Sequence, residues 1–310
     1  MSAINSLSTK WKVLIGLGLY IGIFAILLLV AGSAGKNEEF QPQNEFLLEP
    51  WIPIDVAGID LSINKAVLYL VLASVATIVT MIWISSRMQR EPNKVQMLVE
   101  LAYDLTRNNI TGTNIEGEKL ALKWFPFLAA LFFWIWFSNM IGYLPLPTNT
   151  EHPIDVFGLE VPAFALYAAT ANLSIPLVLT LVVWIAYNVE GIREKGVIKY
   201  FASWLPPGLE DMNPIGKGLI FIIEVLSHLV RLISLSVRLF ANILAGHLLI
   251  LFMGGGLAVL LGLAAAGVLT VPVAIVFFLF EIGLISTLQA FIFATLTSIY
   301  LGGATAAEGH

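Results

Sequence analysis

Long runs of apolar residues, separated by short polar segments, organise this chain. A helix that crosses a bilayer needs roughly 20 mostly apolar residues. Four runs of about that length precede a much longer one, which extends from Gly218 to about Gly302. Because lipid offers the backbone no hydrogen-bond partners, each run is predicted to be helical. The four shorter runs cover about residues 13–32, 66–86, 124–145 and 166–188.

The last apolar run is too long for one crossing, so it is predicted to fold into two long helices. Their turn is expected near Gly254-Gly255-Gly256 or in the small-residue run up to Pro272. Six crossings result, and the sequence shows no heptads, low-complexity runs or internal repeats. The predicted fold class is therefore all-α, a polytopic membrane protein of about six helices that ends in a long hairpin.

The first apolar run admits two interpretations. The N-terminus also has the pattern of a signal peptide with a small-residue cleavage site. This pattern consists of basic residues, an apolar run and then Ala31-Gly32-Ser33-Ala34. The run is longer than the roughly 7–15 residues usual for such a peptide, which favours a retained helix. Residues 1–35 are predicted to be an N-terminal membrane helix or signal-like segment, and residues 36–310 one membrane domain.

The positions of lysine and arginine predict the orientation, because cytoplasmic segments carry an excess of both. The segments on one side of the predicted spans hold twelve of these residues, and those on the other side hold two. Both termini are therefore predicted to be cytoplasmic. On the outer side, residues 40–63 mix Trp51, Pro53 and apolar residues with acids, which suits an aromatic belt along the membrane surface.

The cytoplasmic segment 92–118 is predicted to contain an amphipathic helix at the membrane interface. Its apolar residues recur at helical spacing, which is typical of a helix with one apolar face. These residues are Val95, Leu98, Val99, Ala102 and Leu105.

Composition narrows the classes of function. The chain is 58% hydrophobic and 12% charged, whereas a typical soluble domain has roughly 25% charged residues. This excludes an ordinary soluble enzyme, and the absence of cysteine excludes a disulfide-stapled secreted module. A net charge of −5 leaves no basic surplus for nucleic acid. From Gly218 onward only five charged residues remain: Glu224, Arg231, Arg238, Glu281 and Glu308.

The fifth predicted helix carries a polar stripe. Because an α-helix turns by about 100° per residue, the spacing of its members places them all within an arc of roughly 80° on the helix surface. From Glu224 to Asn242 the stripe is about 27 Å long, close to the thickness of the hydrocarbon layer. A stripe of this kind must face protein or water. It comprises Glu224, His228, Arg231, Arg238, Asn242 and Gly246.

The two arginines of the stripe differ in what they require. Arg231 could extend to the cytoplasmic interface, or form a structural pair with Glu224 seven residues earlier. Arg238 lies deeper in the run, and a guanidinium stays protonated in a protein. A charge at that depth costs at least about 2.5–3.5 kcal/mol, so a partner carboxylate is expected.

The last two predicted helices hold further titratable residues. Glu281 is the only acid in the last helix, and Gln289 follows it by eight residues. His247 lies away from the Arg238 face, beside the small Gly246, where another helix could approach closely. An intramembrane histidine is often only packed and hydrogen-bonded. A histidine and a glutamate on adjacent helices can also form a proton relay.

Several stretches of the chain resemble subunit a of the rotary F-type ATP synthase, the membrane F0 sector. The most specific are SLSVRLFANILAGH (234–247) and LQAFIFATLTSIYL (288–301). The resemblance covers roughly residues 45–302. Its weaker parts are EPNKVQMLVE (91–100), FSNMIGYLP (137–145) and TANLSIPLVLTL (170–181), which are similar to the family's cytoplasmic helix, the end of its next span and its following helix.

The resemblance implies a stator subunit with no active site of its own, no cofactor and no metal. Such a subunit holds two offset proton half-channels against a ring of c subunits, which the long tilted hairpin of the last two helices faces. It works with b-type peripheral stalk subunits and other F0F1 subunits in the bacterial plasma membrane, and with no nucleic acid.

The resemblance also implies roles for individual residues. Arg238 matches the family's essential arginine, whose fixed charge stabilises the ionised ring carboxylate between the half-channels and cannot relay a proton. The other matches belong to the proton path: Glu224 as an access acid, Ser234 and Asn242 as polar positions, Gln289 as the glutamine beside the arginine, and His247 and Glu281 as an interacting pair.

The sequence departs from the family at Glu281. It precedes Gln289 by eight residues, whereas the family spacing is seven. Either a one-residue bulge realigns this helix, or Glu281 faces a somewhat different direction. The apolar span at 13–32 also extends beyond the family pattern.

Two other classes of function compete with the stator. An intramembrane metalloenzyme would use Glu224, His228, His247 and Glu281 as ligands, but the sequence has no HExxH motif. A stand-alone ion-coupled transporter would usually show internal repeats with broken helices at corresponding positions, and the sequence shows none.

Overall fold

The fold consists of two compact units in the computed structural model. The larger unit comprises Leu48–Leu244 and Leu284–His310, and the smaller unit comprises Met1–Leu47 and Ala245–Gly283. Their borders fall within helix α8 (Pro214–Leu251) and within the π-helical turn η5 (Glu281–Ile285). The structure describes residues 8–31, 46–56, 58–89, 91–156, 159–205, 213–256 and 264–306.

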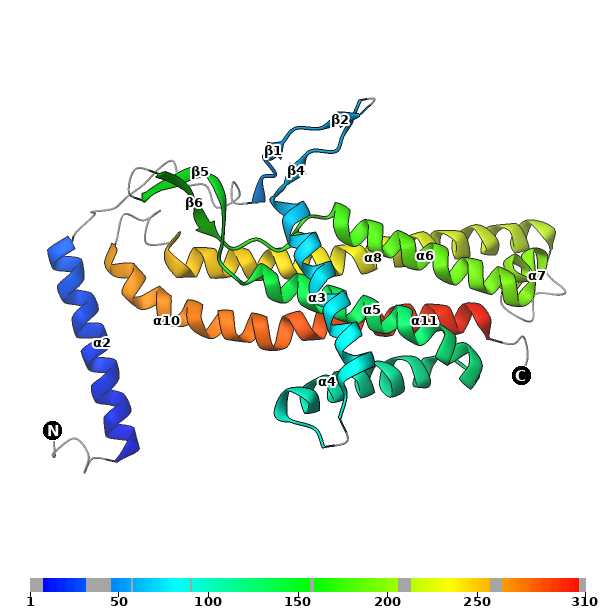
Figure 1. Cartoon of the computed structure of the whole chain (residues 1–310), viewed down its shortest axis with the longest axis horizontal. Helices are drawn as coiled ribbons and strands as arrows, with labels where there is room; N and C mark the ends of the chain where they lie inside the picture. The colour runs from blue at the N-terminus through cyan, green and yellow to red at the C-terminus, as the bar shows by residue number, and fades with distance from the viewer. Residues whose placement is uncertain are drawn as a thin grey trace. The chain divides into compact units, whose positions relative to one another are not determined.

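Helices make up most of the larger unit. They are α3 (Lys65–Arg87), α4 (Lys94–Asp104), the π-helical η2 (Leu105–Gly112), α5 (Glu118–Gly142), the 3-10 turn η3 (Ala169–Ala171), α6 (Ser174–Lys195), α7 (Val197–Ala202), most of α8, and α11 (Ser286–Thr305). α11 packs against both α5 and α6, and α3 runs across α5 (Figure 1). This arrangement confirms the predicted all-α class.

The described part of the larger unit also contains three two-stranded antiparallel sheets. The strands are β1 (Pro50–Ile52), β2 (Asp55–Val56), β3 (Ile59–Asp60), β4 (Ile63–Asn64), β5 (Leu146–Val156) and β6 (Leu159–Ala165). β1 pairs with β4, β2 with β3, and β5 with β6. The described part of the predicted surface segment 40–63 is therefore a β-hairpin, and it exposes Trp51 and Ile52.

Local sequence signals explain where several helices begin and end. Asn64 caps α3 by accepting a hydrogen bond from the backbone N–H of Val67 (3.3 Å). Pro214 opens α8, where its fixed φ suits the first turn and its missing N–H has no helical partner to lose. α6 ends at Gly196, whose positive φ (79°) favours glycine.

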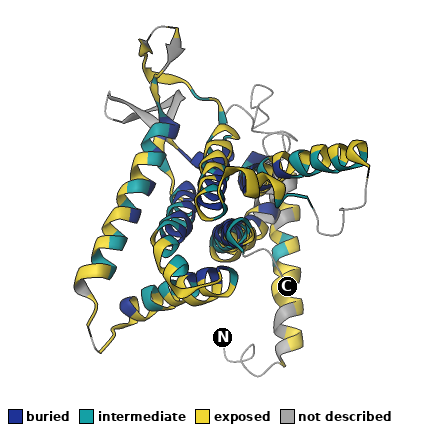
Figure 2. Ribbon diagram, turned by 90° about the vertical axis from the view of Figure 1, so that its right-hand side faces the viewer, coloured by how far each residue is buried: buried dark blue, intermediate teal, exposed yellow. Residues whose placement is uncertain are grey.

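Side-chain hydrogen bonds fix the packing between the central helices. The indole N–H groups of Trp134 and Trp136 donate to Ser74 on α3 (3.0 Å) and to Thr287 on α11 (3.1 Å). Thr170 donates to the buried Asn139 on α5 (2.7 Å). Buried residues concentrate where these helices meet (Figure 2). The polar bonds position α11 with a specificity that apolar contacts alone would not give.

Residues 92–118 contain the predicted helix, but its apolar face does not make the packing contacts. α4 continues into η2, but Val95 and Leu98 remain exposed. The anchoring contacts come later: Ser298 on α11 donates to the backbone carbonyl of Ile110 (2.7 Å). Gly302 lies so close to the Asn114 carbonyl that a Cβ would overlap it. The segment is thus tied to α11 at its C-terminal part, while α4 keeps an apolar surface.

The smaller unit contains α2 (Thr9–Ala31), the end of α8, the π-helical η4 (Phe252–Gly256), and α10 (Ala264–Phe280), which continues into η5. Within this unit α2 packs against α10. The residues of the possible cleavage site at 32–34 lie outside the described part of the chain.

Five described helices are long and apolar enough to cross a membrane: Lys65–Ser86, Glu118–Gly142, Ser174–Lys195, Pro214–Gly256 and Thr270–Thr305. The last two confirm that the final apolar run forms two long helices. Their separation follows the glycine run, and Pro272 lies inside α10. A shorter apolar stretch, Leu14–Ile23, lies in α2, so the sixth crossing stays a prediction. The fourth span begins later than the predicted residue 166, because η3 occupies Ala169–Ala171 and α6 begins only at Ser174.

Candidate functional site

The N-terminal half of α8 carries a charged cluster. The Glu224 carboxylate accepts a hydrogen bond from Arg231 (Nη2 to Oε1, 3.4 Å). The same oxygen lies 4.0 Å from Nε2 of His228. The guanidinium of Arg231 also lies over the ring of Tyr300 on α11, 5.8 Å from its centroid. The structure therefore confirms the predicted pair between Glu224 and Arg231.

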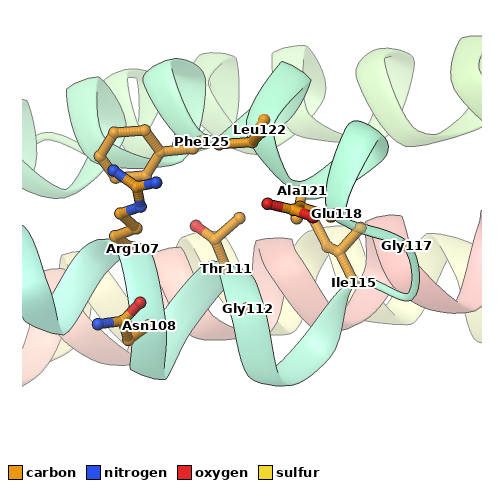
Figure 3. A pocket seen from close by; sticks show the side chains of 10 residues that line it. All are labelled: Arg107, Asn108, Thr111, Gly112, Ile115, Gly117, Glu118, Ala121, Leu122 and Phe125. Carbon is orange, nitrogen blue, oxygen red and sulfur yellow. The ribbon is translucent and has the colours of Figure 1, made fainter.

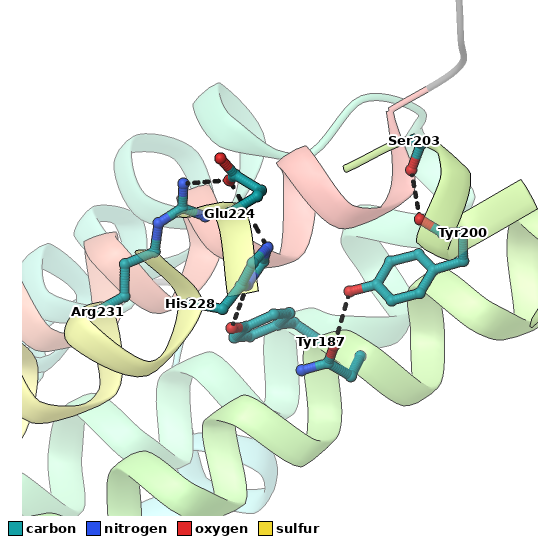
Figure 4. Close-up of polar contacts among 7 residues, drawn as sticks. Tyr187, Tyr200, Ser203, Glu224, His228 and Arg231 are labelled. Carbon is teal, nitrogen blue, oxygen red and sulfur yellow. Dashed lines mark hydrogen bonds and ion pairs between the residues drawn. The ribbon is translucent and has the colours of Figure 1, made fainter. Parts of the chain in front are cut away.

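His228 is enclosed by groups from other elements. Its Nδ1 lies 3.0 Å from the hydroxyl oxygen of Tyr187 on α6 (Figure 4). Its ring stacks on Trp204 with centroids 4.1 Å apart. Burial raises the pKa of the neighbouring Tyr200 on α7, whose hydroxyl donates to Asn188 (2.9 Å). Tyr187 and Tyr200 are not marked by any sequence pattern, because only folding brings α6, α7 and α8 together.

The cluster lines an open cavity of about 410 Å³. Its polar lining includes Lys195 and Ser203 in addition to the charged cluster. Such a volume holds several water molecules, since one occupies about 30 Å³ of liquid. The complete lining is Tyr187, Lys195, Tyr200, Ser203, Trp204, Glu224, His228, Arg231, Ile299, Tyr300, Gly303 and Ala304. The arrangement can therefore bring water to titratable side chains on α8.

The middle of α8 presents an exposed polar row. Ser234, Arg238 and Asn242 lie four residues apart on one exposed face. In the described parts of the chain, none of these three side chains forms a hydrogen bond or an ion pair. Leu235, Leu239 and Ile243, each about 100° round the helix from the preceding polar residue, form an apolar buried face. Packing of that apolar face directs the polar row outward.

In the smaller unit, Glu281 meets the turn of α8 that carries His247. Both residues are buried, with 8% and 2% of their surface exposed. The Glu281 carboxylate lies so close to Gly246 that a Cβ on this glycine would overlap it. The small residue thus allows the close approach that the sequence predicted.

The extra residue between Glu281 and Gln289 has a structural counterpart. η5 is π-helical from Glu281 to Ile285, and a π-turn takes in one more residue than an α-turn. This confirms the bulge, one of the two alternatives that the spacing left open. Gln289 itself is buried on α11, and no hydrogen bond joins it to Arg238 among the described residues.

A second hollow, of about 380 Å³, lies between η2 and the start of α5 (Figure 3). Arg107 and Glu118 reach its rim, and Arg107 donates to the Tyr103 hydroxyl (2.9 Å).

In the described ranges, no three His, Asp or Glu side chains gather in a way that could hold a metal. The described residues therefore provide no set of metal ligands for the metalloenzyme alternative.

Comparison with known proteins decides the family. A family model described as ATP synthase A chain matches residues 67–302, well over half of the chain. The chain belongs to the ATP synthase subunit a family. Relatives named ATP synthase subunit a support this across most of their length. The protein of Rubrobacter xylanophilus is 35% identical over 263 residues, 84% of this chain and 91% of the relative.

Two further subunit a sequences agree. The Campylobacter concisus protein is 37% identical over 225 residues, which cover 73% of this chain and 82% of the relative. The Helicobacter pylori protein (strain P12) is 37% identical over 239 residues, 76% of this chain and 89% of the relative. Membership in the subunit a family, as a multi-pass membrane protein of ATP synthesis, confirms the resemblance noted in residues 234–247 and 288–301.

Proposed function

We propose that this member of the subunit a family is the stator that conducts protons to and from a ring of c subunits. The observation that supports this most is Arg238. It carries a permanent charge in the middle of an apolar helix, on an exposed face, with no acid beside it in the described chain. An intramembrane arginine needs a partner. A carboxylate on a neighbouring subunit meets that need.

The chemistry of this pairing accounts for coupling. An arginine beside an ionised carboxylate stabilises the charged form, so a ring carboxylate releases its proton as it reaches Arg238. Because the guanidinium does not deprotonate in proteins, it cannot pass that proton directly to the other side. Protons must then travel with the ring, which turns proton flow into rotation.

Two half-channels would meet this arginine from opposite ends of α8. Glu224 and its water-accessible cavity precede Arg238 along the helix, and His247 with Glu281 follows it. Ser234, Asn242 and Gln289 are assigned as the polar positions next to the ring. His247 and Glu281 are assigned as the relay on the second side, because both are buried and Glu281 packs against Gly246, the residue next to His247.

The remaining assignments follow from this role. The chain has no independent active site and serves the proton-translocating sector of the complex. Its partners are the c ring, b-type stalk subunits and other F0F1 subunits in a bacterial plasma membrane, with both termini cytoplasmic. The bacterial origin of the relatives and the distribution of lysine and arginine support this location.

The test is Arg238→Ala in the whole complex. Proton-driven ATP synthesis should be abolished, while the c ring and stalk still co-purify with the chain at normal levels. ATP synthesis in vesicles energised by a proton gradient, and then by a sodium gradient, would also show which ion is coupled. An assembled Arg238→Ala complex that makes ATP at the normal rate would overturn the proposal.

A further inference from the structure

We propose that His228 is a proton carrier between the water-accessible cavity and Glu224, and this inference rests on the proposed function. Its position is unusual for a structural histidine, because each ring nitrogen faces a different proton-exchanging group. Nδ1 lies 3.0 Å from the Tyr187 hydroxyl, and Nε2 lies 4.0 Å from the Glu224 carboxylate. The ring thus bridges α6 and the polar stripe of α8.

The surroundings hold this ring in the bridging position. His228 is 8% exposed, and the Trp204 indole stacks on it with ring planes only 21° apart. An indole face also stabilises a cation, so the stack tolerates the protonated ring that a carrier must form. Figure 4 shows the imidazole between Tyr187 on one side and Glu224 on the other.

Charges from each neighbouring element set the direction of exchange. On α8, Arg231 donates a hydrogen bond to the Glu224 carboxylate, which is the group that receives the proton. Tyr187 and Lys195 on α6, Tyr200 on α7 and Tyr300 on α11 line the same cavity and carry no carboxylate. Glu224 is thus the sole anion in the cavity lining, and a proton on His228 is drawn toward it.

The transfer needs no other reactant. Nδ1 takes a proton from a hydronium ion in the cavity, which becomes water, either directly or through the Tyr187 hydroxyl, which gives up one proton and regains another. The imidazolium then releases its Nε2 proton to Oε1 of Glu224, which leaves a neutral ring with its proton on Nδ1. Loss of that proton to cavity water and uptake of one at Nε2 restore the starting tautomer. A small rotation of the Glu224 side chain, or one bridging water, closes the 4.0 Å gap. The net result is one proton moved from hydronium in the cavity to Glu224.

Two substitutions separate proton transfer from packing. His228→Gln keeps polar contacts but carries no proton, and His228→Ala opens space for a free five-membered ring. Passive proton flux through vesicles holding the assembled complex should fall at least about tenfold in both variants. The fall is limited because Glu224 is itself partly exposed. Ser227→Ala, the neighbouring residue on α8 outside the cavity lining, should conduct normally.

Chemical rescue supplies the deciding measurement. Added imidazole should restore flux in His228→Ala, whereas pyrazole, a ring of the same size that stays neutral, should not. Normal flux in His228→Gln would overturn the inference. So would equal rescue by both rings or by neither, because each result assigns His228 to packing alone. Arg238→Ala in the same vesicles separates the two ideas: if it abolishes coupling while His228→Gln conducts normally, only the carrier role fails.

Discussion

Two arginines on α8, seven residues apart, have opposite surroundings. Arg231 is bonded to Glu224 and lies over the ring of Tyr300, so its charge is balanced within the chain. Arg238 is exposed and has no hydrogen-bond or ion-pair partner in the described residues. The difference supports the proposal that the Glu224–Arg231 pair belongs to the fold of this subunit and that Arg238 finds its partner on another subunit. Substitutions at the first kind should affect local structure, and substitutions at the second kind should affect coupling.

The largest expected effect comes from Arg238→Lys, with Arg231→Lys as its matched control. Lysine keeps the positive charge but can lose its proton when desolvated, so it can pass a proton that arginine would block. Arg238→Lys should therefore abolish ATP synthesis and raise the proton leak through vesicles. Arg231→Lys should retain most of the synthesis rate, because the charge opposite Glu224 is preserved.

The measurement is ATP synthesis and proton leak in vesicles with equal amounts of assembled complex. Equal losses of ATP synthesis in the two lysine variants would contradict the proposed difference between Arg231, which has a partner within the chain, and Arg238, which has none in the described residues. A fully active Arg238→Lys complex would show that charge alone, without the fixed protonation of arginine, is sufficient at this position.

Much of the fold was predictable because the bilayer limits the choice of structure. Apolar length alone predicted α3, α5 and both final helices, since only helices satisfy their own backbone in lipid. The spacing of charges predicted the contact between Glu224 and Arg231, which depends only on helix periodicity. The hairpin of β5 and β6 was not predicted, because it lies between two predicted spans and apolar length does not show which strands pair there.

The environment of His228 could not be predicted, for a different reason. Its partners come from α6, from the residues after α7 and from α8 itself, and no periodic rule connects segments that far apart. The π-turn at Glu281 is an intermediate case. The eight-residue spacing between Glu281 and Gln289 indicated one extra residue, but only the backbone shows that a π-helical turn accommodates it.

An intermediate effect is expected from Gly246→Ala, with Gly218→Ala on the same helix as control. A Cβ at Gly246 would overlap the Glu281 carboxylate, whereas a Cβ at Gly218 would meet nothing within 4 Å. Overpacking of this kind costs typically about 1–3 kcal/mol, and here it displaces a residue of the proposed relay. Gly246→Ala should slow proton flux and lower the unfolding temperature of the complex, and Gly218→Ala should change neither. A normal proton flux with Gly246→Ala would show that proton transfer does not depend on the exact position of Glu281.

The smallest effect on coupling is expected at a charged pair that the chain balances internally. Lys123 on α5 bonds to Glu190 on α6, whose side chain is fully buried, and Arg193 lies 3.9 Å from the other carboxylate oxygen. Lys123→Met leaves this carboxylate poorly compensated and should cost roughly 1–3 kcal/mol of stability, less than a fully buried pair because Lys123 is half exposed. Lys119→Met, at an exposed position of the same helix, should cost little.

Thermal unfolding followed by tryptophan fluorescence would measure the stability, and proton flux per assembled complex should stay normal in both variants. A loss of flux in Lys123→Met without a loss of stability would show that even an internally balanced charge takes part in conduction.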